Sequence, residues 1–397
     1  MSGKTPGRRP IACVVGARPN YMKMAPLARA FGARAELPPI VLIHTGQHYD
    51  VAMNERLFAD LELPPPDLNM QVGSGTHAVQ TAEIMRRFEP VLDELAPSCV
   101  VVVGDVNSTL ACSLVAAKKR TPVVHVEAGL RSFDRDMPEE VNRVLTDQIA
   151  DRLFTTERSA ADNLAREGIP AERVRFVGNV MIDSLRRHQQ RAVRPADTLG
   201  REGIAAGFLG ADGRFGVVTL HRPSNVDDRA ALQESLSLLR EAARRLPLVW
   251  PVHPRARENI ARFGWSSLLA EARVALRPPQ GYLEMLGLLA NATFVLTDSG
   301  GIQEETTALA VPCLTMRDNT ERPSTVAQGT NTLVGRNRLR ALECVDEILR
   351  TGGKRGRMPE LWDGHAAERI ADDLSVWLDA SHGAGNASRR VGTGTGG

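Results

Sequence analysis

The chain has 397 residues, a length that predicts two domains rather than one. Its 49 Lys and Arg residues nearly balance 47 Asp and Glu residues. The resulting net charge of +2 gives no electrostatic reason to expect a nucleic-acid or membrane-surface partner. Hydrophobic residues make up 43% and charged residues 24% of the chain, which excludes disorder over most of its length.

The first half alternates short apolar runs with longer amphipathic segments. The predicted strands are Ile11–Gly16, Val41–Gly46, Cys99–Asp105, Pro122–Gly129 and two runs near Phe154 and Phe176. Helices are predicted over Leu110–Lys119 and over Thr81–Leu95, where Pro90 is expected to kink or break the helix. Continuous apolar strands are typical of a parallel sheet covered by helices on both faces.

The pattern weakens around residues 186–214, and a second series then begins. Its predicted strands are Phe215–His221, Leu248–His253, a run near Leu276, Thr293–Asp298 and Val311–Met316. The fold class is therefore α/β, with two Rossmann-like doubly wound domains, 11–185 and 205–363, facing a cleft. Residues 364–380 are expected to form a helix that packs back on the first domain. Residues 1–10 and 381–397 are expected to be disordered.

The five cysteines are odd in number and form no CxxC pair. They are Cys13, Cys99, Cys112, Cys313 and Cys344, and we expect buried structural thiols in a reducing compartment and no zinc site. No run reaches the roughly 18 apolar residues that span a bilayer, and no signal-peptide pattern follows the N-terminus. The expected location is the cytoplasm.

Ligands of open parallel sheets bind beyond the carboxyl ends of the strands, where this chain places many polar residues. The segment DSGGIQEE is the best phosphate candidate, because free N–H groups at a helix N-terminus and nearby glycines favour an anion. Its candidate residues are Ser299, Gly300, Gly301 and Glu305, the last of which could reach ribose hydroxyls. The alternative is a tight strand–helix turn with an N-cap Ser and a carboxylate in the first turn of the helix.

Three cations follow other strands and could face a phosphate: Arg18, Lys23 and Arg322. Each could equally be a solvated surface cation. The GxGxxG fingerprint of dinucleotide binding is absent, and so are a GxSxG motif and any metal-ligand spacing.

Carboxylates close to apolar strands are the candidates for acid/base chemistry, since desolvation raises the pKa of such groups. They are Asp105, Glu127 and the pair Glu139–Glu140. Alternatively, Glu127 pairs with Arg131, and Glu139–Glu140 only mark a helix start after Pro138. His221 and His253 end two strands of the second domain, which favours a binding role over a structural one. The pattern indicates nucleotide-sugar chemistry.

The ordered motifs resemble those of the non-hydrolysing UDP-N-acetylglucosamine 2-epimerases, from about residue 11 to residue 378. They read GARPNYMKMAPL, TGQHYD, GDVNSTLA, HVEAGLRSFDRDMPEEVNR, TLHRPSN, PVHPR, LTDSGGIQEE and RDNTERPSTV. The resemblance implies the glycosyltransferase-B arrangement of two Rossmann-like domains. It also implies an isomerase that interconverts UDP-GlcNAc and UDP-ManNAc through a 2-acetamidoglucal intermediate, without cofactor or metal.

The resemblance also implies residue roles. Asp105, Glu127 and Glu139 would be catalytic, with His221 near the diphosphate; Arg18, Ser299, Gly300, Gly301, Glu305 and Arg322 would hold UDP, and Lys23 would support the first-domain site. Gln47 and His48 match part of an allosteric UDP-GlcNAc site. A homodimer is implied, with no nucleic-acid or membrane partner.

Two departures concern the sugar contacts. Many members have Glu where this chain has Asn20, and many have HRxEN where this chain has His221–Asn225. Three alternatives therefore stay open within this chemistry: a 2-epimerase for a related nucleotide sugar such as a 2,3-diacetamido uronic acid, a hydrolysing 2-epimerase, and a glycosyltransferase. A non-catalytic sensor is less favoured, because it would need binding groups but no bases.

Overall fold

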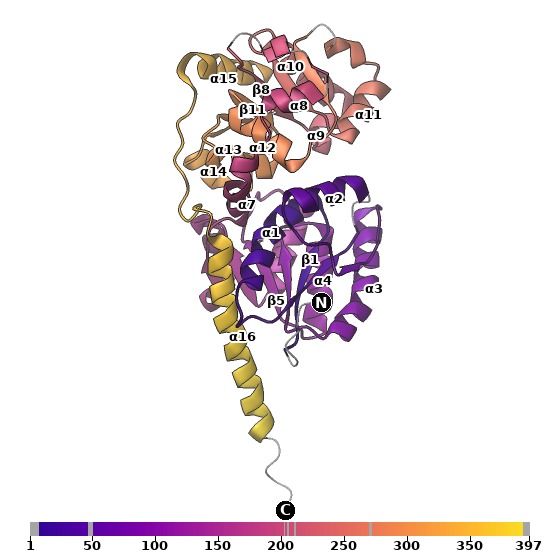
Figure 1. The fold of residues 1–397 in the computed structure, drawn as a ribbon, viewed down its shortest axis with the longest axis vertical. Coiled ribbons are helices and arrows are strands. Elements are labelled where there is room, and N and C mark those ends of the chain that lie inside the picture. Colours follow the sequence, from indigo (N-terminus) through magenta and orange to yellow (C-terminus); the bar gives the residue numbers. More distant parts are fainter. Residues whose placement is uncertain are drawn as a thin grey trace, which may run out of the picture. The chain divides into compact units, whose positions relative to one another are not determined.

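The chain divides into two compact units, each built around its own parallel sheet (Figure 1). In the computed structural model, the first unit comprises residues 1–130, 134–184 and 363–397, and the second comprises residues 131–133 and 185–362. The structure describes residues 8–46, 51–201, 203–204, 206–209, 212–269 and 272–391. The predicted class, a doubly wound α/β fold in two halves, is confirmed.

The first unit holds a seven-stranded parallel sheet in the order β3-β2-β1-β4-β5-β6-β7. Its strands are β1 Ile11–Val15, β2 Ile40–His44, β3 Leu68–Asn69, β4 Cys99–Val103, β5 Val123–Ala128, β6 Arg152–Thr155 and β7 Val174–Phe176. Every residue of β1, β4, β5 and β6 is buried, as strands covered on both faces require. The strand order reverses between β1 and β4, so ligands are expected at the carboxyl ends of these two strands.

Helices cover both faces of this sheet (Figure 1). They are α1 Arg18–Gly32, α2 Val51–Asp60, α3 His77–Leu95, α4 Asn107–Lys118, α5 Pro138–Ile149 and α6 Arg158–Arg166, followed by α7 Val180–His188 at the unit boundary. The prediction that Pro90 breaks its helix is wrong, because α3 continues through it to Leu95. Pro90 and Arg86, whose carbonyl loses its partner N–H, are both exposed, so water can satisfy that carbonyl.

The second unit repeats the architecture with six parallel strands in the order β10-β9-β8-β11-β12-β13. The strands are β8 Gly216–Thr219, β9 Leu248–Pro251, β10 Val274–Arg277, β11 Phe294–Thr297, β12 Cys313–Thr315 and β13 Asn331–Leu333. The helices are α8 Pro195–Arg201, α9 Pro223–Val226, α10 Arg229–Ala243, α11 Pro254–Arg262, α12 Tyr282–Asn291, α13 Gly300–Ala308, α14 Pro323–Ala327 and α15 Arg338–Thr351. The order reverses between β8 and β11, which marks the ligand edge of this sheet.

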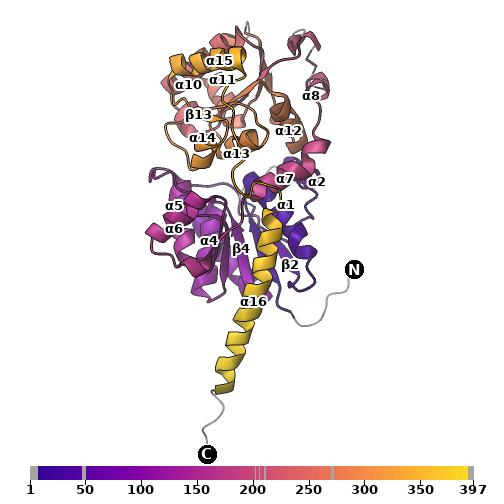
Figure 2. The ribbon, with the colours of Figure 1, turned by 90° about the vertical axis from the view of Figure 1, so that its left-hand side faces the viewer.

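The last helix, α16 Ala366–Val391, returns to the first unit and lies against α1 (Figure 2). Asp183 of α7 accepts hydrogen bonds from the Ala366 and Ala367 N–H groups at 3.2 and 2.7 Å. Further along the helix, Ile370 and Leu374 are fully buried. These contacts make α16 a structural part of the first unit.

Both expected disordered ends are partly ordered. Helix α16 continues beyond residue 380 to Val391, because 381–391 extend its hydrogen-bonded backbone despite their Gly and Ser content. Near the other end, Arg9 donates to the carbonyls of Ala96 and Pro97 at 2.6 and 3.1 Å, which fixes residues just before β1. Residues 1–7 and 392–397 lie outside the described residues.

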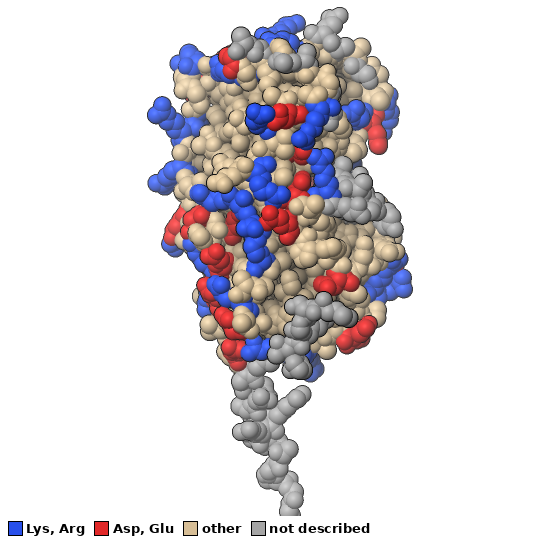
Figure 3. All heavy atoms as spheres, viewed as in Figure 1, with Lys and Arg blue, Asp and Glu red and all other residues tan. Residues whose placement is uncertain are grey.

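Charged side chains of both signs are interspersed on the face shown in Figure 3. This mixture fits the formal net charge of +2. Over the residues that the structure describes, no helix combines the length and apolar character needed to cross a membrane.

Candidate active site

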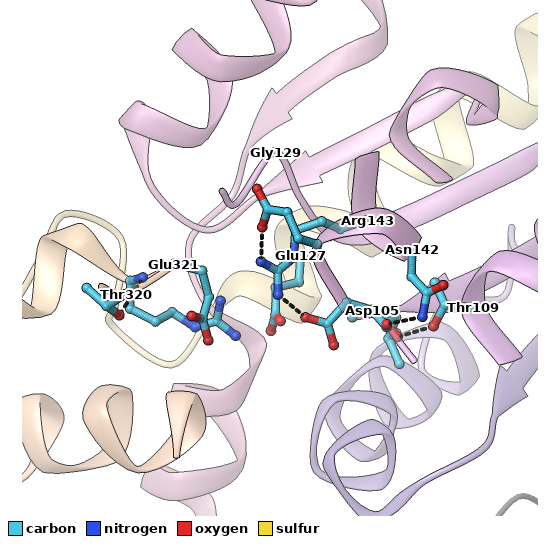
Figure 4. A network of polar contacts seen from close by, with 12 residues as sticks. Asp105, Thr109, Glu127, Gly129, Asn142, Arg143, Thr320 and Glu321 are labelled. Atoms are coloured by element: carbon cyan, nitrogen blue, oxygen red, sulfur yellow. Dashed lines mark hydrogen bonds and ion pairs between the residues drawn. The ribbon is translucent and has the colours of Figure 1, made fainter. Parts of the chain in front are cut away.

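Asp105 follows β4 and is held by α5 (Figure 4). The Arg143 guanidinium pairs with the Asp105 carboxylate and, at 2.5 Å, with Glu140. Asn142 donates to the Asp105 carbonyl at 2.9 Å. The Arg143 side chain is 3% exposed and that of Asp105 is 21% exposed, so a buried cation orients a carboxylate that solvent reaches.

Glu127 lies near the end of β5 in a backbone conformation that side chains rarely adopt, with φ of 72°. Its Oε1 is 2.6 Å from Lys23 Nζ, and both side chains are at most 6% exposed. Gly104 permits this pair, because a Cβ there would lie 2.9 Å from Lys23 Nζ. The ammonium stabilises the negative charge of the Glu127 carboxylate. Two sequence-predicted residues, Lys23 and Glu127, are thus brought together.

Glu139 and Glu140 occupy the first turn of α5, directly after Pro138. Glu140 is 1% exposed and is paired with Arg143, so it helps to hold the guanidinium that contacts Asp105. Glu139 is half-buried on the same turn. The helix-start interpretation therefore holds for both residues, and Glu139 keeps its candidacy as an acid or base.

Asn20 is buried at the start of α1, and its side chain is hydrogen-bonded to backbone groups. Its Oδ1 accepts from the N–H groups of Gly16 and Ala17 at 3.0 and 3.1 Å, and its Nδ2 donates to the Val103 carbonyl at 3.0 Å. An ionised Glu could accept but not donate here. Asn20, where many family members have Glu, therefore joins the turn after β1 to the end of β4.

In the second unit, His221 follows β8 and Asp298 follows β11, at the switch point of the sheet. Nδ1 of His221 is 2.8 Å from Asp298 Oδ1, and the His221 side chain is 43% exposed. Burial alone would raise the pKa of Asp298, but His221, the Arg222 N–H and Asn225 outweigh it and lower the pKa. The ionised carboxylate orients the His221 ring through its Nδ1 atom.

Helix α13 begins at Gly300, and Ser299 is its N-cap residue. The expectation of an N-cap Ser is therefore confirmed, although the Ser299 side chain makes no capping hydrogen bond; the expectation of a carboxylate in the first turn is wrong, because the first turn of α13 holds no acidic residue. A Cβ atom at position 300 would lie 2.5 Å from Glu321 Oε1, which explains the need for glycine there. Gly301 follows in the first turn and is half-buried.

Glu305 is buried deeper in α13. Burial, followed by the neighbouring charge of Glu304, raises the pKa of Glu305 to about 8. Glu304 forms an ion pair with the Arg322 guanidinium, with Nε 2.8 Å from Oε1, and both side chains are at most 6% exposed. Arg322 is thus held by an acid rather than solvated at the surface.

For three further predicted residues, the structure gives less information about the site. Gln47 and His48 lie outside the described residues. Arg18 begins α1 in the first unit and is half-buried. Among the described residues, no group of three or more His, Cys, Asp or Glu side chains could hold a metal ion.

Sequence reasoning missed the partners of the acids. They are Asn142 and Arg143 on α5, Glu304 on α13, and Arg317, which pairs with Glu321 at 2.6 Å. A usable signal existed for Arg143, which stands three residues after Glu140 and therefore shares its helix face.

The family of the chain is decided by comparison with known proteins. Residues 33–375 match the family model described as UDP-N-acetylglucosamine 2-epimerase. The chain belongs to the UDP-N-acetylglucosamine 2-epimerase family. A relative of that name from Methanocaldococcus jannaschii is 40% identical over 372 residues, which cover 92% of this chain and 98% of the relative.

Other members of the family frame the substrate question. The crystal structure of the Methanocaldococcus jannaschii epimerase in complex with UDP-GlcNAc and UDP matches with a TM-score of 0.84 at 38% identity, covering 92% of this chain and 99% of that one. A UDP-2,3-diacetamido-2,3-dideoxy-D-glucuronate 2-epimerase from Pseudomonas aeruginosa is also 40% identical, over 92% of this chain and 99% of the relative.

Proposed function

We propose that this epimerase-family chain interconverts UDP-GlcNAc and UDP-ManNAc. The observation that carries the proposal is the pair of carboxylates after β4 and β5, each held by a buried cation: Asp105 by Arg143 and Glu127 by Lys23. A carboxylate held in a fixed position is suited to remove a proton from carbon. Family membership supplies the nucleotide sugar as the substrate class.

The reaction begins at C2 of the sugar. A carboxylate accepts the C2 proton, the C–H electron pair forms the C1–C2 double bond, and the C1–O bond breaks to release UDP. The intermediate is 2-acetamidoglucal. UDP then adds back to C1 while a proton is delivered to the opposite face of C2. Because the two faces need separate proton carriers, Asp105, Glu127 and Glu139 are the candidates for these roles.

The second unit holds UDP in this proposal. Departure of UDP develops negative charge, which N–H groups at a helix start and nearby cations stabilise. The supporting features are the uncapped Ser299, Gly300 and Gly301 at the start of α13, with the Arg322 charge held by Glu304. His221, fixed by Asp298, assists at the diphosphate, and Glu305 faces the ribose.

One experiment tests the proposal: proton NMR of the purified protein with UDP-GlcNAc in deuterium oxide. The expected result is UDP-ManNAc carrying deuterium at C2, with little free UDP. Free ManNAc together with UDP would overturn the non-hydrolysing assignment in favour of a hydrolysing 2-epimerase.

A second candidate substrate is a UDP-linked 2,3-diacetamido uronic acid. It is favoured by the Pseudomonas aeruginosa relative, whose identity of 40% equals that of the Methanocaldococcus jannaschii epimerase. The same experiment with this nucleotide sugar distinguishes the two. Deuterium incorporation from this sugar, without incorporation from UDP-GlcNAc, would reassign the substrate.

Assembly and location are also proposals. A homodimer follows from the family resemblance and is tested by light scattering on the eluted protein. The cytoplasm is supported by five free cysteines, four of them buried, because unpaired thiols persist in a reducing compartment.

A further inference from the structure

A histidine–aspartate pair is buried between β5 and α5 in the first unit. His125 of β5 and Asp147 of α5 are both 0% exposed, and their Nδ1 and Oδ1 atoms are 2.7 Å apart. The other ring nitrogen, Nε2, is 2.8 Å from the Gly104 carbonyl oxygen. The other Asp147 oxygen accepts the Gly129 N–H at 3.0 Å.

The partners of this pair link it to two turns. A carbonyl oxygen cannot donate, so Nε2 of His125 donates to Gly104. One Asp147 oxygen accepts the Gly129 N–H, and the other is hydrogen-bonded to Nδ1 of His125. The pair therefore connects the Gly104 carbonyl to the Gly129 N–H.

The pair holds both turns that carry the candidate catalytic carboxylates. Gly104 immediately precedes Asp105, and Gly129 stands two residues after Glu127. The backbone is left-handed at all three turn positions, with φ of 67° at Gly104, 72° at Glu127 and 78° at Gly129. Such conformations persist only where surrounding contacts determine them.

Helix α5 connects this pair to Asp105 by a second route. Arg143, which pairs with the Asp105 carboxylate, stands one turn before Asp147 on the same helix. Neighbouring Asn142 donates to the Asp105 carbonyl. Helix α5 therefore positions the Asp105 side chain through Arg143. It also positions the backbone at Gly129 through Asp147 and at Gly104 through His125.

A buried polar pair is a costly way to gain stability, since apolar residues of similar volume often stabilise the fold as well or better. Its value here is positional. We propose that His125 and Asp147 are positioning residues for the epimerase reaction, an inference that rests on the proposed function. They hold the turns after β4 and β5 so that Asp105 and Glu127 meet the sugar at the correct distance.

Four substitutions separate the parts of the pair. His125→Gln keeps a donor toward Gly104 only, and His125→Asn keeps a donor toward Asp147 only. Asp147→Ala removes both acceptors. Asp147→Asn can donate to Nδ1 of a neutral ring and still accept the Gly129 N–H, so it preserves every hydrogen bond while removing the charge.

We expect Asp147→Ala and both His125 variants to lose about 100-fold in kcat, because misplacement of a reacting group by about 1 Å costs this much. KM and the Kd for UDP are expected to stay within about threefold, because UDP is held by the second unit. Asp147→Asn should recover most of the kcat lost in Asp147→Ala. Unchanged kcat in Asp147→Ala, or equal losses in Asp147→Asn and Asp147→Ala, would overturn the proposal.

The matched control is Asp183→Ala. Asp183 is also a buried carboxylate of the first unit, but its two backbone hydrogen bonds go to the start of α16. This variant should lower the free energy of unfolding without lowering kcat of the folded enzyme. An equal loss of kcat in the control would show that Asp147→Ala acts through stability alone, and would count against positioning.

A measurement without substrate separates this inference from the proposed function. In protein carrying 15N-histidine, the ring signals missing from His125→Gln identify His125 among the nine histidines. Its Nε2 should carry a proton in the wild-type protein, whatever sugar the enzyme accepts, because the Gly104 carbonyl can only accept. An unprotonated Nε2 would overturn the proposal, whereas failure to convert UDP-GlcNAc would count only against the proposed substrate.

Discussion

Asp105 and Glu127 each stand at the end of an apolar strand, and each meets a cation from a helix distant in sequence. The strand ends could be predicted, because the runs of Val that precede them define where the sheet stops. The partners could not. Nothing in the sequence relates the rotation of α5 to β4, so the contact between Arg143 and Asp105 appears only in the fold.

Asp105→Asn tests the catalytic role with little cost to folding. Arg143 keeps its bond to Glu140, so the substitution leaves no buried cation alone. We expect kcat to fall by about 10²- to 10⁴-fold, the usual contribution of a positioned general acid or base. The measurement is the initial rate of C2 deuterium incorporation.

The control for Asp105→Asn is Glu83→Gln on α3, which alters a carboxylate paired with Arg86 and Arg87 at the surface. Its rate should match that of the wild type. A rate for Asp105→Asn within a few-fold of the wild type would remove Asp105 from the catalytic set.

The proposed contact of Glu305 with the ribose predicts that UDP binding depends on pH. With its pKa raised to about 8, the carboxyl is mostly protonated at neutral pH. If ribose hydroxyls donate to it, binding requires the ionised form and releases a proton. Between pH 6 and 8 the ionised fraction rises from about 1% to about 50%, so the affinity of wild type relative to Glu305→Gln should rise about 50-fold.

Calorimetric titration of UDP at both pH values measures this effect. Comparison with Glu305→Gln cancels titration of the nucleotide and of other groups. The same pH dependence in both proteins would show that Glu305 stays protonated and does not accept from the ribose.

At the scale of elements, the strands within apolar runs were predictable, and β3 and β13 were not. β3 and β13 have two and three residues, too few to show a period, and they exist only because a neighbouring strand offers hydrogen bonds. The turn before α13 was predictable from Ser299–Gly301, whereas the absence of a side-chain cap depends on a rotamer.

The junction of α7 and α16 predicts a pH-dependent stability. Burial raises the pKa of Asp183 to about 6, even though the Ala367 and Ala366 N–H groups lower it. The folded pKa exceeds the ordinary value of 3.8, so the folded state binds the proton more readily. The stabilisation of the folded state by protonation of Asp183 is complete below about pH 4. It is lost as pH rises through 6, by about 3 kcal/mol in all.

Asp183→Asn provides the reference, because it cannot titrate. Hydrogen exchange measures the free energy of opening α16 in the wild type and in the variant. The wild-type value minus the variant value should be smaller at pH 7 than at pH 4. A difference that stays constant across this range would show that Asp183 keeps an ordinary pKa.

At the scale of the whole molecule, the first unit depends on a segment that follows the second. Removal of residues 363–397 deletes, among others, the large buried side chains of Ile370, Leu374 and Leu378. At about 1.5–3 kcal/mol each, their loss is comparable to the stability of a whole domain. We expect the amides of β4 in the shortened chain to exchange rapidly with solvent, while the second unit still binds UDP.

Removal of residues 381–397 alone is the control, since it spares those three side chains. Its β4 amides should stay protected. Equal protection in both shortened chains would show that the first unit folds without α16.

The return of α16 to the first unit also has a consequence for biosynthesis. Residues 8–184 leave the ribosome first, yet the face of α1 that α16 covers stays open until residues 366–380 emerge. At about 5–20 residues per second, making the intervening second unit takes about 10–40 s. The C-terminal half can therefore reach its native state on the ribosome before the N-terminal half, which reverses the usual vectorial order. During that interval the nascent N-terminal half is the part that a chaperone would recognise.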